Sequence, residues 1–426
     1  MFNNGIMKQV LTSAGVLAFG AASLCAYDPE MTRQSTGSPF SLSGTVRGFY
    51  DDNVNTSPTD KTRDDSFGFQ VIPAVHLNLP LEQTFLSVGY IYTLTWYDNR
   101  ADNDTDQAHE FNAKLRHTFS PRQKISVDDS FVYTSEPTVA DKSQGIITSP
   151  LRSEGSVYHN YGAIDYGIGL TKTMDLSLGY ANNWYDYTQD GDGSRSALLD
   201  RIEHLIRGDI RYNFNPKLVG IVGYTYGFTT YTDDELIDPS SSSLKSDSRD
   251  NRSHYVYGGV DYDITAKLQT SIRLGWQFIE YNNLDNQKSS NPYADISASY
   301  RILSGTSVEA GVKHSRNATD VEAIDGNGDP TTDAETTAVY TRFSHQITRE
   351  LSGSILGQYQ HSVFNDGIND GESEDLWLAG INLAYAFNRH WSAEIGYNYD
   401  QLVSHVKSAD RGYDRNRAYI GVTARY

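Results

Sequence analysis

The sequence predicts an all-β protein: a single-domain transmembrane barrel of about 18 strands (roughly 16 to 18) with antiparallel, up-and-down topology. Three observations support this prediction. Apolar and polar side chains alternate with period two, the alternating runs last about 10 to 14 residues, and short connections alternate with long ones. Strands of soluble sheets usually last about 5 or 6 residues, whereas a tilted strand that crosses a membrane needs about 9 to 11. The length of the runs therefore favours a membrane barrel.

Two runs illustrate the alternation. In residues 67–79 the odd positions are mostly apolar, from Phe67 to Leu79, and in residues 86–96 the even positions are apolar, from Leu86 to Trp96. Successive side chains of a strand face opposite ways. One face of each run would therefore contact lipid, and the other would face the inside of the barrel.

Short turns and long loops alternate along the chain. Eight turns and nine loops separate eighteen strands, which places both termini on the side of the turns. The turns are Pro80–Gln83, Ser120–Gln123, Thr171–Thr173, Asn215–Lys217, Thr265–Lys267, Ser304–Thr306, Thr348–Glu350 and Asn388–His390. The loops lie near 51–65, 98–107, 135–155, 188–198, 232–252, 282–291, 317–335, 364–374 and 404–414. Bacterial outer-membrane barrels share the even strand number, the short periplasmic turns and the long external loops.

The turns also carry a soft repeat of roughly 40 to 50 residues. In each copy an apolar residue precedes a polar turn with a basic residue, as in Phe214–Leu218 and Ile347–Leu351. Asn-Pro and Ser-Pro pairs favour turns. A β-propeller blade has a similar period but holds four short strands, so two long strands per repeat favour the barrel.

Composition limits the class of protein. The chain has 426 residues, one Cys and a formal net charge of −19, and its mean hydropathy is −0.53. A polar average is compatible with a barrel, because only every second residue of a strand faces lipid. The acidic balance argues against binding of nucleic acid, which needs a basic surface.

The N-terminus has the features of a secretory signal peptide, expected at residues 1–26. Lys8 supplies the positive charge, residues 10–22 form the apolar region, and cleavage is expected after Ala22 or Ala26. Leu24 before Cys25 argues against a lipoprotein, because the lipidation signal needs a small residue there. Residues 27–40 would form a short periplasmic segment and residues 41–426 the barrel, placed in the bacterial outer membrane.

Aromatic residues gather where strands would meet the two membrane surfaces, as in the girdles of membrane barrels. At the loop ends these are Trp96, Tyr97, Tyr133, Trp184, Tyr185, Tyr187, Phe228, Tyr231, Phe278 and Tyr281. At the turn ends they are Phe119, Tyr212, Phe214, Tyr300, Tyr385, Phe387, Trp391 and Tyr426. The final run, 418–426, ends on Tyr426 and resembles the C-terminal signal by which the barrel assembly machinery recognises its clients.

One stretch resembles a known group of proteins. Residues 41–54 end in Asp51-Asp52-Asn53-Val54, and the next run contains Pro73. This stretch is similar to the outer-membrane β-barrel porin families of unknown substrate. The resemblance implies a barrel and a porin-like role, and it supplies no functional residue.

The polar face of the runs would line the pore. Charged side chains cost roughly 2–4 kcal/mol toward the lipid midplane and little toward water. The expected pore-lining residues are Arg47, Lys114, Arg116, Arg207, Arg211, Arg273, Arg301, Arg342, Arg417, Arg425, Glu203, Asp209 and Glu394, with Glu110, Asp175, Asp261, Gln277, Asp295, Glu309, Lys313, Gln358 and Asn398 on the same face. The arginines could form an anion path, or acidic neighbours could pair with them in a closed charge network.

Two loops have features that bear on the pore and on cation binding. The loop at 135–155 could fold inward as a constriction or pack at the mouth. Residues 320–335 are rich in Asp and Glu and lack Lys and Arg, so they would attract cations at low salt. Asp325, Asn327 and Asp329 resemble the start of a calcium loop, but Pro330 and Thr336 replace the Gly and Glu that an EF-hand needs. We expect no cofactor.

Three functions follow from these observations. The first is a channel for passive diffusion of small hydrophilic solutes, possible in a barrel of this size because about 18 strands leave an aqueous channel. The second is an export conduit or surface scaffold, for example for a polysaccharide. The third is a lipase or protease at the rim using His204, His314 or His361, although no nucleophile motif accompanies them. We expect outer-membrane lipid and small solutes as partners, a homo-oligomer as an option, and no catalysis.

Overall fold

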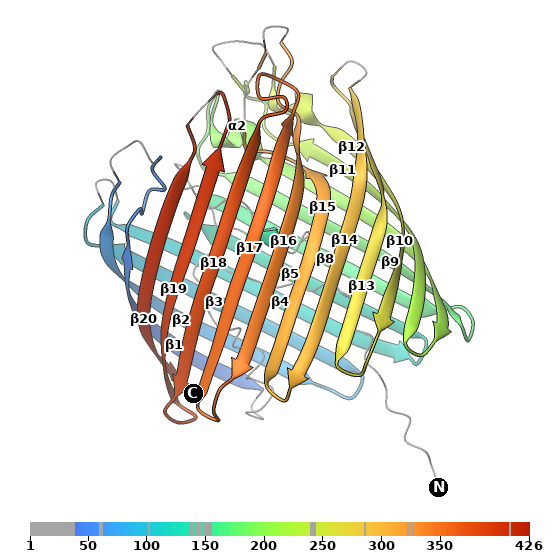
Figure 1. Ribbon diagram of the computed structural model, residues 1–426, viewed down its shortest axis with the longest axis vertical. Coiled ribbons are helices and arrows are strands. Elements are labelled where there is room, and N and C mark those ends of the chain that lie inside the picture. Colours follow the sequence, from blue (N-terminus) through green and yellow to red (C-terminus); the bar gives the residue numbers. More distant parts are fainter. Residues whose placement is uncertain are drawn as a thin grey trace.

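The computed structural model describes residues 39–58, 63–100, 103–135, 140–141, 146–147, 156–238, 244–284, 287–321, 324–325, 328–408 and 410–426. The expected signal peptide, and nearly all of the expected periplasmic segment at 27–40, lie outside these residues. Eighteen antiparallel strands form one sheet, and its first and last strands pair, so the sheet closes into a barrel (Figure 1). This confirms the predicted fold class.

The barrel strands have 12 to 16 residues each. In chain order they are β1 (Phe40–Asp51), β2 (Ser66–Pro80), β3 (Thr84–Tyr97), β4 (Thr105–Ser120), β5 (Gln123–Thr134), β8 (Val157–Gly169), β9 (Met174–Tyr187), β10 (Arg201–Asn215), β11 (Leu218–Tyr231), β12 (Asn251–Asp263), β13 (Leu268–Tyr281), β14 (Lys288–Leu303), β15 (Thr306–Asn317), β16 (Asp333–Gln346), β17 (Leu351–Asn365), β18 (Ser373–Ala386), β19 (Trp391–Ser404) and β20 (Tyr413–Arg425). Two short strands, β6 (Ala140–Asp141) and β7 (Ile146–Ile147), pair with each other. Two short helices, α2 (Arg195–Leu199) and the 3-10 helix η1 (Ser246–Arg249), lie in the loops.

The described residues contain no helix that is long and apolar enough to span a membrane.

The repeated turn sequence has a common hydrogen-bond pattern. Asn215 Oδ1 accepts the amides of Lys217 and Leu218 at 2.8 and 3.1 Å. Thr171, Thr265, Thr348 and Asn388 each accept, in the same way, the amides two and three positions later. Side-chain oxygens of Asn and Thr stabilise tight turns in this way. The repeat therefore encodes the turns that set the register of the hairpins.

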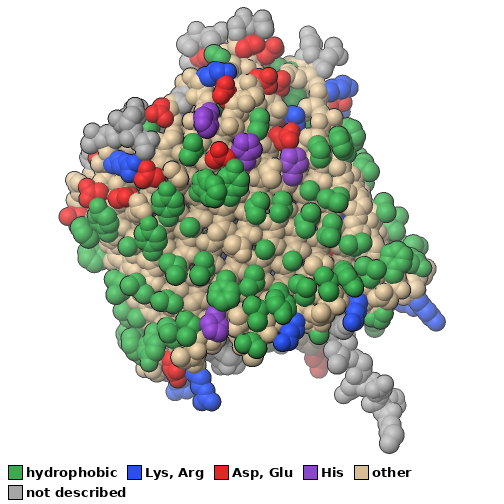
Figure 2. Space-filling model, in the orientation of Figure 1, with side chains coloured by type: hydrophobic (Ala, Val, Ile, Leu, Met, Phe, Trp, Pro, Cys, Tyr) green, Lys and Arg blue, Asp and Glu red, His purple; other side chains and the backbone are tan. Residues whose placement is uncertain are grey.

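Apolar side chains cover the outside of the barrel between its charged ends (Figure 2). Val222, Ile420 and Phe214 are each more than 60% exposed. All eight aromatic residues predicted at the turn ends are exposed, so this girdle is confirmed.

The girdle predicted at the loop ends is partly wrong. Trp96 and Phe278 are exposed on the outer face, but Tyr97, Tyr185, Tyr231 and Tyr281 are buried inside the barrel, and Tyr187 packs against a buried cluster of loop residues. The reason is the pleat: adjacent residues such as Trp96 and Tyr97 face opposite ways. Three of the inward rings lie under guanidinium groups of Arg100, Arg201 and Arg249.

Candidate functional site

The inner wall of the barrel carries paired charges on neighbouring strands. Arg47 Nη2 lies 2.7 Å from Glu394 Oε1, and its Nη1 donates to Gln70 at 3.2 Å. Arg417 lies 2.8 Å from Asp51. These pairs join β1, β2, β19 and β20 across the seam where the barrel closes.

A second group lies on β8 to β13. Arg207 pairs with Asp165 and lies 3.7 Å from Asp209, and the Tyr257 hydroxyl donates to Asp209 at 2.6 Å. Arg211 and Arg273 share Asp261, at 2.6 and 2.8 Å. Charges removed from water need such partners.

The remaining candidate pore residues divide into ones with an oppositely charged neighbour and two that lie near the turn ends. Arg116 lies 2.8 Å from Asp128, which is also the register partner of Lys114. Arg342 lies 3.5 Å from Glu309, and Glu203 lies 2.7 Å from Arg201. Arg301 and Arg425 lie apart from these groups, near the turn ends of β14 and β20. Most of the arginines therefore belong to a charge network along the wall, and a solute route along them stays a prediction.

Loops from different sides of the barrel meet at its loop end around Asp320. Arg411 holds both carboxylate oxygens of Asp320, at 2.9 and 3.0 Å, and Arg195 lies 3.8 Å from the same group. We call these three residues the mouth bridge. Arg195 begins α2, between β9 and β10, while Arg411 precedes β20. Ten strands separate those two connections one way around the sheet and eight the other way, so the bridge joins nearly opposite sides of the barrel.

Further contacts pack these loops together. Arg249 of η1 is buried and donates to the carbonyls of Leu198 and Thr319. Ser246 donates to the carbonyl of Ala197 at 2.6 Å. Apolar side chains form two clusters here: Leu198, Leu199 and Ile237 lie between loops, and Val321 packs against Ala334 and Phe364 at the ends of β16 and β17. These loops therefore pack against one another at the loop end of the barrel, at the top of Figure 1, and we call them the cover.

The electrostatics of the cover follow from burial and pairing. Burial alone would raise the pKa of Asp320, but Arg411 and Arg195 outweigh it and hold this pKa below its ordinary value. Burial would lower the pKa of Arg411, but Asp320 and Glu374 raise it. Asp320 and Arg411 are therefore both charged at neutral pH.

A second acidic group in the cover behaves in the opposite way. Asp200 follows α2, and burial raises its pKa to about 6, while hydrogen bonds from Ser196 and the Tyr187 amide oppose the shift. The Ser196 hydroxyl lies 2.5 Å from Asp200 and 2.7 Å from Asp233. One hydroxyl proton cannot serve two carboxylates at once, so this arrangement favours a protonated carboxyl.

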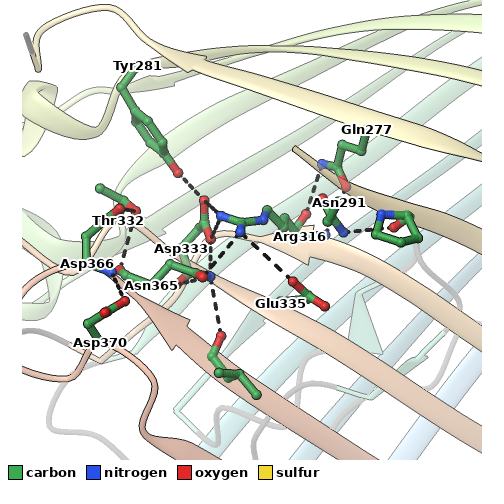
Figure 3. A network of polar contacts seen from close by, with 12 residues as sticks. Gln277, Tyr281, Asn291, Arg316, Thr332, Asp333, Glu335, Asn365, Asp366 and Asp370 are labelled. Carbon is green, nitrogen blue, oxygen red and sulfur yellow. Dashed lines mark hydrogen bonds and ion pairs between the residues drawn. The ribbon is translucent and has the colours of Figure 1, made fainter. Parts of the chain in front are cut away.

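The base of the 317–333 loop is anchored where β15 leaves its neighbour (Figure 3). Pairing of β14 with β15 ends at Ala294 and His314, although β13 and β14 continue to pair beyond that point. The side-chain amide of Gln277 replaces the missing strand contacts: it accepts the Arg316 amide at 2.9 Å and donates to its carbonyl at 3.3 Å. Gln277 is 1% exposed, so these two bonds are shielded from water.

Asp333 completes this anchor. It is buried between Arg316, whose Nη1 lies 3.1 Å away, and the hydroxyl of Tyr281, which donates to it. Asn365 donates to the same carboxylate at 2.7 Å. Residues of four strands, β13, β15, β16 and β17, thus meet at one carboxylate (Figure 3), which directly follows the loop that carries Asp320.

The sequence alone indicated little of this site. Asp320 was singled out only as one member of an acidic loop, and Arg195, Arg249 and Arg411 were not among the predicted functional residues. Of the loop at 135–155, only the backbones of β6 and β7 and residue 135 fall within the described residues, so its predicted inward fold lies outside them. Asp325 Oδ1 accepts the amide of Asp329 at 2.9 Å, and the described residues contain no cluster of His, Cys, Asp or Glu arranged for a metal ion.

The three histidines considered for a rim enzyme have partners that do not form a catalytic triad. His204 Nδ1 lies 2.8 Å from the Tyr180 hydroxyl. His314 contacts Thr337 and Glu335, and His361 contacts Asp375. A hydrolase of this kind needs a serine on the imidazole, and none of these partners is a serine.

The chain is similar to known outer-membrane porins. The model of the family described as Putative beta-barrel porin 2 matches residues 40–426. Among solved structures, OpdK of Pseudomonas aeruginosa is 11% identical, with a TM-score of 0.44 over 91% of this chain and 99% of that one. OccAB4 of Acinetobacter baumannii (11%, TM-score 0.43) and a BenF-like porin of Pseudomonas fluorescens (10%, TM-score 0.43) cover the same shares. No curated protein sequence is significantly similar to the chain.

Proposed function

The chain belongs to the Putative beta-barrel porin 2 family and is a porin of the bacterial outer membrane, and we propose that small hydrophilic solutes diffuse passively through it past a narrow external mouth. The single observation that carries the proposal is the mouth bridge. Because Asp320 draws Arg411 and Arg195 together from nearly opposite sides, a solute must pass beside the bridge or wait for it to open.

The balance of charge supports a preference for cations at the mouth. Most arginines of the wall are neutralised by an adjacent carboxylate, whereas the whole chain has a formal net charge of −19. The surplus of Asp and Glu falls largely in the loops, such as Asp366, Asp370 and Glu372. An acidic rim concentrates cations and repels anions at low ionic strength.

Planar-bilayer recording of the purified, folded chain tests this proposal. We expect discrete open steps, with a reversal potential that favours cations in a low-salt gradient. Silence from protein that is shown to be folded would contradict a diffusion channel and favour the export conduit or scaffold.

We also propose how the chain is processed and which partners it has. Residues 1–26 are a signal peptide that is removed, and the barrel occupies residues 41–426. The assembly machinery recognises the last strand, which closes the barrel as Tyr426 exchanges backbone hydrogen bonds with Leu42 at 2.8 and 3.1 Å. The chain is not an enzyme. It can form homo-oligomers, which cross-linking in native membranes tests.

A further inference from the structure

We propose that three tyrosine–histidine motifs on the outer surface of the barrel bind phosphate groups of outer-leaflet lipid, most strongly where Arg252 lies beside His254. The motifs are the pairs Tyr90 and His109, Tyr180 and His204, and Tyr224 and His254. The inference depends on the barrel lying in the outer membrane, and it does not depend on the pore.

The three motifs have the same geometry. In each, the tyrosine hydroxyl lies 2.7 to 3.0 Å from Nδ1 of a histidine on the next strand. Each tyrosine is the register partner of the residue two positions beyond its histidine, namely Phe111, Ile206 and Val256. The same diagonal contact on three separate hairpins indicates a repeated structural unit.

An aromatic residue on the following strand is the register partner of each histidine. Tyr133, Phe228 and Phe278 are the register partners of His109, His204 and His254. The ring centroids of His204 and Phe228 are 4.4 Å apart, and those of His109 and Tyr133 are 5.9 Å apart. Ring contacts therefore help to hold these two imidazoles in position, and the ring of His254 lies against Tyr226, with centroids 5.3 Å apart.

The hydrogen bond sets the chemistry of the ring. A neutral imidazole carries one proton, on one nitrogen or the other. We assign the phenol as the donor to Nδ1. The imidazole proton is then on Nε2, which can donate to a ligand. A phosphate oxygen is an acceptor suited to such a donor.

The motifs lie close to the level of the lipid headgroups. His204 and Tyr212 are eight residues apart on β10, as are His254 and Tyr262 on β12, and both tyrosines are exposed at the turn end. At about 3.3 Å per residue this separation is about 26 Å along the strand, and strand tilt reduces it along the membrane normal. At the strand tilt of about 35–45° found in such barrels, the separation along the normal is about 18–21 Å, and the apolar band is about 25 Å tall, so the imidazoles lie just inside its outer boundary, within reach of the headgroups.

Charge distinguishes the three motifs. Arg252 is exposed on the same face of β12, two residues from His254, and its register partner Glu280 lies 2.7 Å from Lys288. Two positive groups against one negative leave this cluster with a net charge of +1. The residues in the corresponding positions beside His109 and His204 are Gln107 and Ile202, which are uncharged. We therefore expect the site on β12 to bind most tightly.

Another side of the barrel lacks this chemistry. His314 Nε2 lies 3.3 Å from Glu335, and His361 Nδ1 lies 2.8 Å from Asp375. Imidazoles beside carboxylates are visible above the apolar band on the face shown in Figure 2. A phosphate would be repelled there, so the bound lipid is confined to the part of the barrel that carries the three motifs.

Native mass spectrometry of the folded full-length chain with defined lipids tests the proposal. The probes are diphosphoryl lipid A and monophosphoryl lipid A. We expect the doubly phosphorylated lipid to bind more tightly. Replacing both groups of the β12 site, Arg252→Gln with His254→Gln, should weaken its binding about tenfold or more, because two hydrogen bonds to a charged group are lost.

The matched control is His345→Gln. His345 also faces outward and also contacts a hydroxyl, that of Thr306 at 2.7 Å, but it lies at the turn end of the barrel. Its replacement should leave binding of diphosphoryl lipid A unchanged. An equal loss in this control, or unchanged binding in the double variant, would overturn the proposal.

Tyr224→Phe provides a second test that keeps both Arg252 and His254. Removing the hydroxyl frees the imidazole tautomer, so binding should weaken several-fold while the gel mobility of the folded barrel is retained. Unchanged binding in this variant would refute the role of the motif. Inorganic phosphate in excess should compete poorly, since the site is expected to hold a lipid and not the free ion; full competition would contradict that assignment.

Discussion

Replacing Asp320 by Asn should open the mouth of the porin. The change removes the charge that holds Arg411 and Arg195 together and leaves the size of the side chain unchanged. The side chain of Asp320 is 29% exposed and that of Arg411 is 11% exposed. Breaking a buried pair costs about 3–5 kcal/mol, whereas an exposed pair contributes about 0–1 kcal/mol. An intermediate loss of about 2 kcal/mol would shift the closed-to-open ratio of the cover about 30-fold.

Single-channel recording measures this shift as the fraction of time spent in the largest open step. The matched control is Asp329→Asn, an exposed carboxylate between the same two strands. Asp320→Asn should raise the open fraction and make the loops more sensitive to protease, while Asp329→Asn should change neither property. Equal dwell times in Asp320→Asn and the unmodified chain, or equal effects of both variants, would refute the role of the bridge.

Three further predictions concern Asp320, Asp200 and the loop that Gln277 anchors. The pKa of Asp320 is held below its ordinary value of 3.8, so the bridge stabilises the closed cover above pH 3.8 and loses this effect as Asp320 is protonated at lower pH. The open fraction of the unmodified chain should therefore rise in acid, and that of Asp320→Asn should stay constant. Because the pKa of Asp200 is raised from 3.8 to about 6, α2 should gain protection from hydrogen exchange as pH falls from about 6 toward 4, and Asp200→Asn should remove that dependence. Gln277→Leu leaves the backbone amide and carbonyl of Arg316 without hydrogen bonds, so the free energy of opening of the 317–333 loop should fall by about 1–3 kcal/mol. Hydrogen exchange measures this change, and Gln269→Leu near the turn end is the control.

The strands and turns could be predicted because their signals are local. Alternation along residues 67–79 requires only the pleat, and the turn at Asn215 requires only one side-chain oxygen and the two amides that follow. The error at Tyr97 came from counting it together with Trp96 without assigning each ring to a face of the strand. The same pleat that predicted the barrel places Tyr97 inside it.

The site could not be predicted because its contacts join distant loops. Asp320 and Arg411 are 91 residues apart, and neither lies in a periodic segment. No pattern in the sequence relates α2 to the loop before β20, since their proximity follows only from closure of the sheet. The tyrosine–histidine motifs are similar: a diagonal contact such as Tyr224 to His254 is visible only once the register of β11 and β12 is known.

The most direct test of the account is recording from the purified chain in a planar bilayer, using protein whose gel mobility changes on boiling and which is therefore a folded barrel. The account predicts discrete conductance steps that favour cations in a low-salt gradient, a preference that weakens toward 1 M salt because the charges of the rim are then screened. Folded protein that gives no conductance in either salt would contradict a diffusion channel.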